Sequence, residues 1–79
     1  MKKALAFILN SIVDEPDKVE IAEEENEGIL TFKIKAASAD MGKIIGKNGK
    51  IIRSIRNVLK IPAIKQNKKI NILLEENSN

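Results

Sequence analysis

The chain has 79 residues, which is enough for one compact domain with a small hydrophobic core. Hydrophobic residues make up 43% of it and charged residues 32%, and no apolar run approaches the roughly 18–20 residues of a membrane-spanning helix, so the composition is that of a globular domain. It contains no cysteine and no histidine, which excludes disulfides and thiolate metal sites and removes the usual acid–base residue of enzymes that work near neutral pH.

The first predicted element is an amphipathic helix over residues 2–13. Its apolar residues recur at the spacing i, i+3, i+4, i+7 and i+8, which places them on one helical face: Leu5, Ile8, Leu9, Ile12 and Val13. Pro16 follows, and because the residue before a proline is disfavoured in helical geometry, we expect the helix to end before it.

Two strands joined by a turn are predicted next. Val19 and Ile21 alternate with charged residues, and the polar run 23–28, which ends in glycine, predicts the turn. The second strand is polar on one side and apolar on the other, and its apolar residues are Leu30, Phe32, Ile34 and Ala36. This pattern predicts a sheet with one face in solvent. We interpret the glutamates of the turn as a solvated hairpin tip and expect no metal site.

Two helices separated by a glycine-containing loop follow. Ser38 is suited to be the N-cap of a short helix over residues 39–45. A second helix is predicted from residue 50 to residue 60, with five residues directed inward: Ile51, Ile52, Ile55, Val58 and Leu59. Pro62 leaves its end open, because a proline inside a helix costs about 3 kcal/mol or more. The helix either stops near Lys60 or continues after a kink to Gln66.

A third strand completes the predicted order helix–strand–strand–helix–helix–strand. A polar turn over residues 67–69 precedes it. Apolar residues then recur at every second position: Ile70, Ile72 and Leu74. We expect residues 1–75 to form one domain and residues 76–79 to be a disordered tail.

The net charge of +3 is unevenly distributed along the chain. Residues 1–40 contain five lysines and nine acidic residues, a net charge of −4, whereas residues 41–79 contain nine lysines or arginines and two acidic residues, a net charge of +7. No acidic residue lies between Met41 and Leu74. A basic block of this length predicts a surface that binds a polyanion, but it is equally compatible with an ordinary solvated face.

The loop between the two later helices carries the clearest functional signal. Gly46 can end the first of these helices at a positive φ without steric cost, and Gly49 leaves no side chain between the backbone and a ligand. Free amides and the positive dipole end of the following helix favour a phosphate. Lys47 and Lys50 flank the loop, and Arg53 lies one turn further on. This arrangement predicts a site for a sugar–phosphate backbone.

Other glycine motifs do not fit the spacing. A P-loop aligned on Gly49 would need a glycine in place of Ile44 and a serine or threonine in place of Ile51. A dinucleotide-binding fingerprint aligned on Gly46 would also need a glycine in place of Ile44. A simple helix–turn–helix connection explains one glycine at a helix end, but not two glycines with three neighbouring lysines.

The run from Ile44 to Ile52 resembles the signature of the KH domain, in which a GxxG loop clamps the nucleic-acid backbone and about four nucleotides are bound. The predicted element order resembles the type II form of this fold. Over residues 1–75 the chain is similar to the small stand-alone bacterial KH proteins of the KhpA/YlqC family. The resemblance implies an α+β domain of order α-β-β-α-α-β, with a three-stranded sheet covered on one face by helices and the GxxG loop between the second and third helices.

The resemblance also implies which residues bind RNA. The loop residues expected to hold the backbone are Gly46, Lys47, Asn48 and Gly49. The residues expected to line the base groove are Gly42 and Lys43, with Ile45 and Ile52 as its apolar floor. The residues expected to meet phosphates or base edges are Lys50 and Arg53. Pro62 is a departure, because relatives usually continue an uninterrupted alanine-rich helix there.

The function implied is that of a non-catalytic RNA chaperone or post-transcriptional regulator that binds single-stranded RNA in the cytoplasm. We expect no cofactor, metal, membrane or small-molecule substrate, and the apolar run after Lys3 ends at Asn10, too early for a signal peptide. The resemblance further implies a homodimer, or a complex with a larger Jag-type KH protein, with effects on cell elongation and division. The residues that we expect at such an interface are Ile61, Ile64 and Leu73.

Two other functions remain open from the sequence. The basic face is also suited to a protein-interaction or ribosome-assembly module that meets an acidic partner. A third possibility is DNA binding, because KH grooves that this one resembles accept single-stranded DNA and a basic face tolerates duplex DNA.

Overall fold

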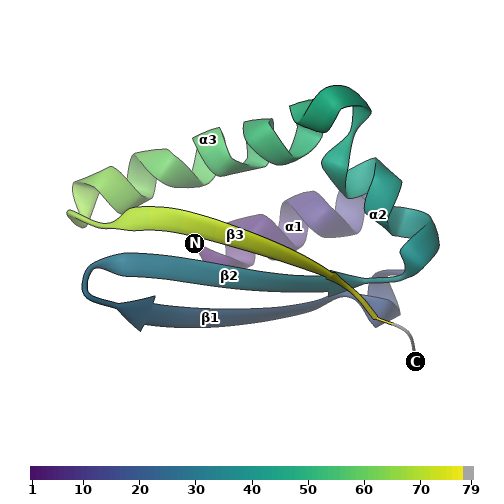
Figure 1. Cartoon of the computed structure of the whole chain (residues 1–79), viewed down its shortest axis with the longest axis horizontal. Coiled ribbons are helices and arrows are strands. Elements are labelled where there is room, and N and C mark those ends of the chain that lie inside the picture. The colour runs from purple at the N-terminus through teal and green to yellow at the C-terminus, as the bar shows by residue number, and fades with distance from the viewer. Residues whose placement is uncertain (78–79) are drawn as a thin grey trace.

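The computed structural model of the chain describes residues 1–77, which form three α-helices and a three-stranded sheet (Figure 1). The helices are α1 (Lys2–Ile12), α2 (Ser38–Ile45) and α3 (Lys50–Lys65), and the strands are β1 (Glu20–Asn26), β2 (Ile29–Ala36) and β3 (Lys69–Glu76). Two short 3-10 turns precede β1 and α3, and these are η1 (Pro16–Lys18) and η2 (Lys47–Gly49). The predicted order of elements is confirmed.

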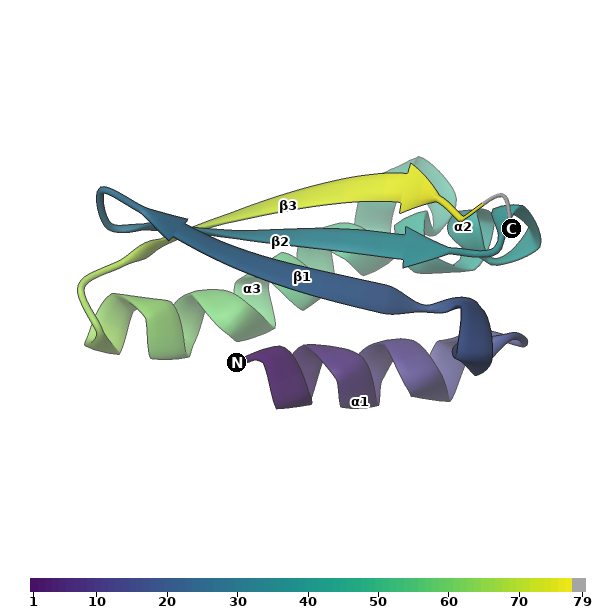
Figure 2. The ribbon, with the colours of Figure 1, turned by 90° about the horizontal axis from the view of Figure 1, so that it is seen from below.

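The central strand of the sheet is β2. It pairs antiparallel with β1, where Glu20 lies opposite Lys35, and parallel with β3, where Ile29 lies opposite Lys69. The helices all lie on one side of the sheet, so its other face is open (Figure 2). This order, with helices on one face of a three-stranded mixed sheet, matches the type II KH fold that we expected.

The hydrophobic core lies between the sheet and the helices. Leu5 and Leu9 of α1 and Ile55 and Leu59 of α3 are buried in one cluster with residues of the sheet. The remaining members of the core cluster are Leu30, Phe32, Ile34, Ala36, Ile44 and Ile72. The four apolar residues predicted to form one side of β2 are thus all buried, because every second residue of a strand faces the same way.

Two apolar residues of α3 that we expected in the core are exposed instead. The side chains of Ile51 and Val58 are 37% and 52% exposed, and Ile52 is half-buried. Since successive residues of a helix are about 100° apart, a helix that turns Ile55 and Leu59 toward the sheet places Ile51 and Val58 on its flank.

The hairpin between β1 and β2 is tighter than predicted. Glu27 and Gly28 form the turn, and both have positive φ angles, 51° and 79°, as a two-residue type I′ turn requires. The predicted turn over residues 23–28 is therefore wrong, because residues 23–26 pair with β2 as part of an edge strand. Hydrophobic alternation does not identify residues 23–26 as a strand, since both faces of this part of β1 are exposed.

The helix α3 continues through Pro62 to Lys65, so the second of the two alternatives for its length is correct. Pro62 lacks the amide that would bond to the carbonyl of Val58, and that residue lies at the surface, where water can bond to the carbonyl. The helix ends in a Schellman motif: Asn67 has a φ of 60°, and the amide of Lys68 donates to the carbonyl of Ala63 at 2.8 Å.

The start of α2 also differs from the prediction. Ser38 is its first helical residue, the N-cap is Ala37, and no side chain caps this end. The side chain that organises this end is that of Asp40, which is buried and accepts hydrogen bonds from the segment after α1.

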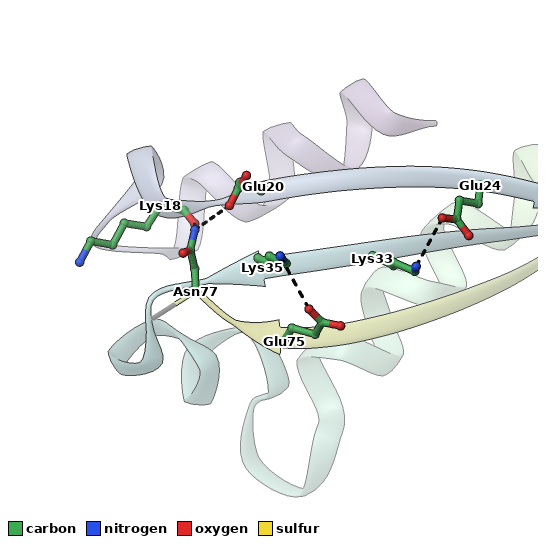
Figure 3. Close-up of polar contacts among 7 residues, drawn as sticks. All are labelled: Lys18, Glu20, Glu24, Lys33, Lys35, Glu75 and Asn77. Carbon is green, nitrogen blue, oxygen red and sulfur yellow. Dashed lines mark hydrogen bonds and ion pairs between the residues drawn. The ribbon is translucent and has the colours of Figure 1, made fainter. Parts of the chain in front are cut away.

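The predicted tail is partly ordered. Glu76 belongs to β3, and the amide of Asn77 donates to the carbonyl of Ala36 at 2.7 Å. The side-chain amide of Asn77 donates to the carbonyl of Lys18 at 3.1 Å and to Oε2 of Glu20 at 2.8 Å, which ties the end of β3 to the start of β1 (Figure 3). Residues 76 and 77, which we expected to belong to the tail, thus lie at the end of β3. Residues 78 and 79 lie outside the described part of the chain.

Candidate nucleic-acid interface

The GxxG loop joins α2 to α3 through three positive φ angles. Gly46 ends α2 with φ 76° and ψ 174°, and its amide donates to the carbonyl of Gly42 at 2.9 Å. Asn48 and Gly49 follow with φ angles of 56° and 74°. Because such angles are rare outside glycine, asparagine and aspartate, the sequence Gly-Lys-Asn-Gly supplies a tolerant residue at each of the three positions.

The two glycines of the loop have different surroundings. A Cβ added to Gly46 would lie 2.6 Å from Cγ1 and 2.9 Å from the backbone nitrogen of Ile51, so α3 packs directly over this glycine. A Cβ added to Gly49 would have Cγ2 of Ile52 as its nearest neighbour, 4.0 Å away. Gly46 is therefore required by packing as well as by φ, whereas Gly49 leaves its backbone open to a ligand.

The loop presents the N-terminus of α3 without an acidic cap. Gly49 is the N-cap, no side chain bonds to the first amides, and the first turn contains no acidic residue. The amide of Gly49 donates to the carbonyl of Gly46 at 3.2 Å and that of Lys50 to the carbonyl of Lys47, so this end offers a ligand chiefly the positive end of the helix dipole. Lys47 and Lys50 are exposed beside it and form no ion pair with any residue from 1 to 77. These groups together attract an anion.

Arg53 contacts the loop from one turn further along α3. Its Nη2 donates to the carbonyl of Asn48 at 3.5 Å. A guanidinium has five N–H donors, so this contact leaves most of them for a ligand.

Lys43 is engaged with acidic side chains. Its Nζ donates to Oδ2 of Asp14 and lies 3.8 Å from Oδ1 of Asp40. The hydrogen bond with Asp14 raises the pKa of Lys43, and burial opposes this effect in part. An ammonium group has three N–H donors, so the contact with Asp14 leaves others for a ligand in the base groove.

Asp40 is the important residue of this region that the sequence analysis did not find. Its side chain is 1% exposed, and its two oxygens accept hydrogen bonds of 3.0 Å from the amides of Asp14 and Glu15. The bond from Asp14 lowers the pKa of Asp40 below 3.8, against the raising effect of burial, and the bond from Glu15 and the charge of Lys43 lower it further. One signal was available, since Asp40 is the last acidic residue before the acid-free block.

The remaining predicted site residues line the surface next to the loop. Ile45 is 37% exposed and Ile52 is half-buried, so both combine packing with an accessible apolar surface. Gly42 is exposed, and no atom lies within 4 Å of a Cβ added to it. The predicted site residues thus gather on α2, η2 and the first turn of α3 at one end of the molecule (Figure 1).

Known proteins are similar to this chain over most of its length. The family model described as "KhpA/KhpB, KH domain" matches residues 2–74. The chain belongs to this KH-domain family. It is 44% identical over 70 residues to the RNA-binding protein KhpA of Clostridium acetobutylicum and 43% identical over 70 residues to that of Clostridium perfringens, each match covering 89% of this chain and 93% of the relative. It is 36% identical over 76 residues to the RNA-binding protein KhpA of Chlamydia trachomatis, covering 96% and 97% of the two chains. No solved structure matches the chain.

Family membership and the structure bear on two expectations from the sequence, the absence of catalysis and the effect of Pro62. The relatives' names describe RNA binding and no reaction, which supports the expectation that the chain is not an enzyme. Pro62, the departure from the family pattern noted in the sequence, neither shortens α3 nor touches the GxxG loop.

Two features are absent from residues 1–77. No helix in this range is long and apolar enough to cross a membrane. The same residues contain no group of three or more histidine, cysteine, aspartate or glutamate side chains placed to hold a metal ion.

Proposed function

We propose that this KhpA/KhpB-family chain is a small cytoplasmic RNA-binding protein that acts as an RNA chaperone or post-transcriptional regulator. It holds about four nucleotides of single-stranded RNA in a groove beside the GxxG loop. The observation that carries the proposal is the N-terminus of α3, where Lys47, Gly49 and Lys50 stand exposed or open with no acidic residue in the first turn. The name of the relatives, RNA-binding protein KhpA, supports RNA as the ligand.

The first contact joins an RNA phosphate to the loop. The phosphate is stabilised by the positive end of the α3 dipole and by the charges of Lys47 and Lys50. The open space around Gly49 lets the sugar–phosphate backbone approach closely. Lys47 and Lys50 add positive charge without having to break an ion pair first.

The bases lie beside the loop on the surface of α2 and α3. Ile45 and Ile52 supply apolar contact, and the missing side chain of Gly42 lets a base approach α2. Arg53 donates to a phosphate or a base edge with the N–H groups that Asn48 does not use.

A double substitution between the two glycines tests the proposal. Lys47→Asp with Asn48→Asp places two carboxylates where a phosphate is expected, so binding of a single-stranded RNA tetranucleotide should be lost. Both side chains are exposed, and aspartate tolerates the positive φ of Asn48, so the circular dichroism spectrum should not change.

A matched control is available on α1. Lys2→Asp with Asn10→Asp makes the same two substitutions at exposed positions of another helix. At physiological ionic strength, where the Debye length is about 8 Å, the control should bind the tetranucleotide as the wild type does. Equal losses in both variants would assign the effect to net charge, and unchanged binding by the loop variant would contradict the proposal.

The alternatives left open by the sequence give different results. If the chain is a binder of duplex DNA, a duplex of equal length will compete better than single-stranded RNA. If it is a protein-interaction or ribosome-assembly module, its partners in a cell extract will persist after treatment with RNase. The proposal expects neither result, because a KH groove takes unpaired bases.

We also propose that the chain pairs with a second KH domain, either its own copy or a larger Jag-type KH protein. The apolar residues that α3 exposes are Ile51, Val58, Ile61 and Ile64, with 37% to 63% of their side chains exposed. Leu73 does not belong to this surface, since it alternates with the buried Ile72 and so faces the open side of the sheet. Pairing would add avidity to a weak single module. Any effect on cell elongation and division stays a prediction.

A further inference from the structure

The GxxG loop contains a pair of residues with a chemistry of its own. Asn48 is the only asparagine in the chain that is followed by glycine. The backbone nitrogen of the residue after an asparagine can attack the side-chain amide, and glycine leaves this nitrogen unhindered because it has no Cβ. Asparagine is one of the thermolabile residues of proteins. The pair Asn48–Gly49 is therefore the position of the chain most prone to deamidation.

The fold leaves the reacting groups accessible. The side chain of Asn48 is exposed, and its amide forms no hydrogen bond with any group of residues 1–77. A Cβ added to Gly49 would have its nearest neighbour 4.0 Å away. Neither the side-chain amide nor the space beside the attacking nitrogen is therefore closed off by packing.

One hydrogen bond and one backbone angle restrain the attack in the closed loop. The amide of Gly49 donates to the carbonyl of Gly46 at 3.2 Å, the long end of the usual range. Asn48 has φ 56° and ψ 28°, which points the Gly49 nitrogen away from the Asn48 side chain. The bond must break and ψ must rotate before the nitrogen meets Cγ. The reaction therefore starts from a locally opened loop, and a ligand that holds the loop closed slows it.

We propose that Asn48 is a site of spontaneous deamidation that ends RNA binding by the GxxG loop. The nitrogen of Gly49 forms a bond to Cγ of Asn48, the bond between Cγ and Nδ2 breaks, and ammonia leaves with the proton of the Gly49 amide. Water then opens the five-membered succinimide ring at one of its two carbonyl groups. The product is aspartate or isoaspartate, and water is the only other reactant.

The product carries a carboxylate where the phosphate of RNA is expected. A carboxylate with a pKa near about 3.9 is charged at neutral pH. It joins a loop flanked by Lys47 and Lys50, and the Nη2 of Arg53 already reaches the carbonyl of Asn48 at 3.5 Å. The new charge therefore competes with a phosphate for these cations. It also suits the positive end of the α3 dipole, so we expect the product to stay folded.

This inference rests on the proposed function, because loss of RNA binding is its consequence. It adds a limit on the lifetime of the binding-competent state. RNA bound at the loop extends that lifetime, since the bound loop opens less often.

Incubation of the purified chain at mildly alkaline pH tests the proposal. Mass spectrometry with peptide fragmentation measures conversion at each asparagine, and Asn48 should convert well before Asn57 and Asn71, which precede β-branched residues. The converted protein, separated by ion exchange, should bind a single-stranded RNA tetranucleotide on the order of tenfold more weakly by fluorescence anisotropy. Its circular dichroism spectrum should be that of the starting protein.

Two controls isolate the reaction. Asn48→Gly tolerates the positive φ and has no side-chain amide, so its affinity for the tetranucleotide, measured against its own starting value, should stay constant during the incubation. Saturating the wild type with the tetranucleotide should slow conversion of Asn48 in proportion to the bound fraction.

Three outcomes would overturn the proposal. They are conversion of Asn48 no faster than that of Asn57, converted protein that binds the tetranucleotide as tightly as the starting protein, and an Asn48→Gly variant that loses affinity at the rate of the wild type. Conversion at an equal rate with and without RNA would contradict the protection by bound RNA. Failure of the proposed function would appear separately, as fresh wild-type protein that does not bind the tetranucleotide before any conversion.

Discussion

Two separate features exclude a side chain at Gly46: its positive φ angle, and the atoms of Ile51 that fill the space where a Cβ would lie. A methyl group at this position would collide with a backbone nitrogen of α3 as well as with a side-chain carbon, so relief requires the helix itself to move. At Gly49 the neighbouring space is open, and the cost of a side chain there comes only from its φ of 74°. The same loop therefore contains one glycine that packing requires and one that a ligand would use.

Alanine substitutions separate these two roles. Gly46→Ala should lower the free energy of unfolding by about 2–4 kcal/mol, because strain in φ and a steric clash combine. Gly49→Ala should lower it by only about 1–2 kcal/mol, the cost of a left-handed conformation. Urea denaturation of the two variants measures the difference. Equal destabilisation, or the reverse order, would contradict the packing described for Ile51.

At the scale of elements, Asp40 joins α2 to the segment that follows α1. Its carboxylate accepts hydrogen bonds from the backbone amides of Asp14 and Glu15, and Lys43 lies beside it on the same helix. The acceptor is needed in its charged form, and the lowered pKa of Asp40 expresses this preference.

The stability of the fold should therefore depend on pH through Asp40. Because its pKa is lower in the folded chain than its usual value of 3.8, its contribution is present above that value and is lost as the pH falls through the folded pKa. Asp40→Asn should lower the unfolding midpoint at pH 7 and flatten its decline below about pH 4. Asp17→Asn, at an exposed position, is the control and should change neither. An Asp40→Asn variant with a wild-type pH profile would contradict this account.

The helices and strands that could be predicted from the sequence are those with one buried face. The alternation of β2 and the helical spacing of α1 both identify residues that the core contains. β1 lies at the edge of the sheet and is exposed on both faces beyond Ile21, so hydrophobic alternation could not separate it from a turn. The passage of α3 through Pro62 depends on packing of Leu59 and Ala63, which local propensity does not include.

The candidate site was predictable to a different extent. Its glycines and lysines are contiguous in the sequence, and the resemblance to KH domains covers them all. The partners of Lys43 could not be predicted, because Asp14 lies 29 residues away and meets it only through the fold.

On the scale of the whole molecule, folding concentrates the uncompensated positive charge on α3. Lys33, Lys35 and Lys68 are each paired with a glutamate, two of them on the open face of the sheet (Figure 3). The cations of α3 have no such partners within residues 1–77. The same helix therefore carries both a basic side and an apolar flank, which suits it to bind RNA and a second KH domain at once.

Single charges on the two faces of the molecule test the proposed pairing. Ile61→Asp places a carboxylate in the apolar flank of α3 and should convert a dimer to a monomer in sedimentation velocity. Leu73→Asp adds the same charge on the open face of the sheet and should leave the dimer intact. Neither residue is in the core, so both variants should fold. A dimer that survives Ile61→Asp but not Leu73→Asp would place the interface on the sheet.

The claim that the GxxG loop binds RNA phosphates is tested most directly by the affinity for a single-stranded tetranucleotide as a function of salt concentration. Three to five phosphate contacts predict a log–log slope of roughly −2 to −4 for the wild type, at about −0.7 for each contact. With Lys47→Asp and Asn48→Asp, binding should be lost at every salt concentration. A slope near zero in the wild type, or an affinity in the loop variant equal to that of the wild type, would contradict the account.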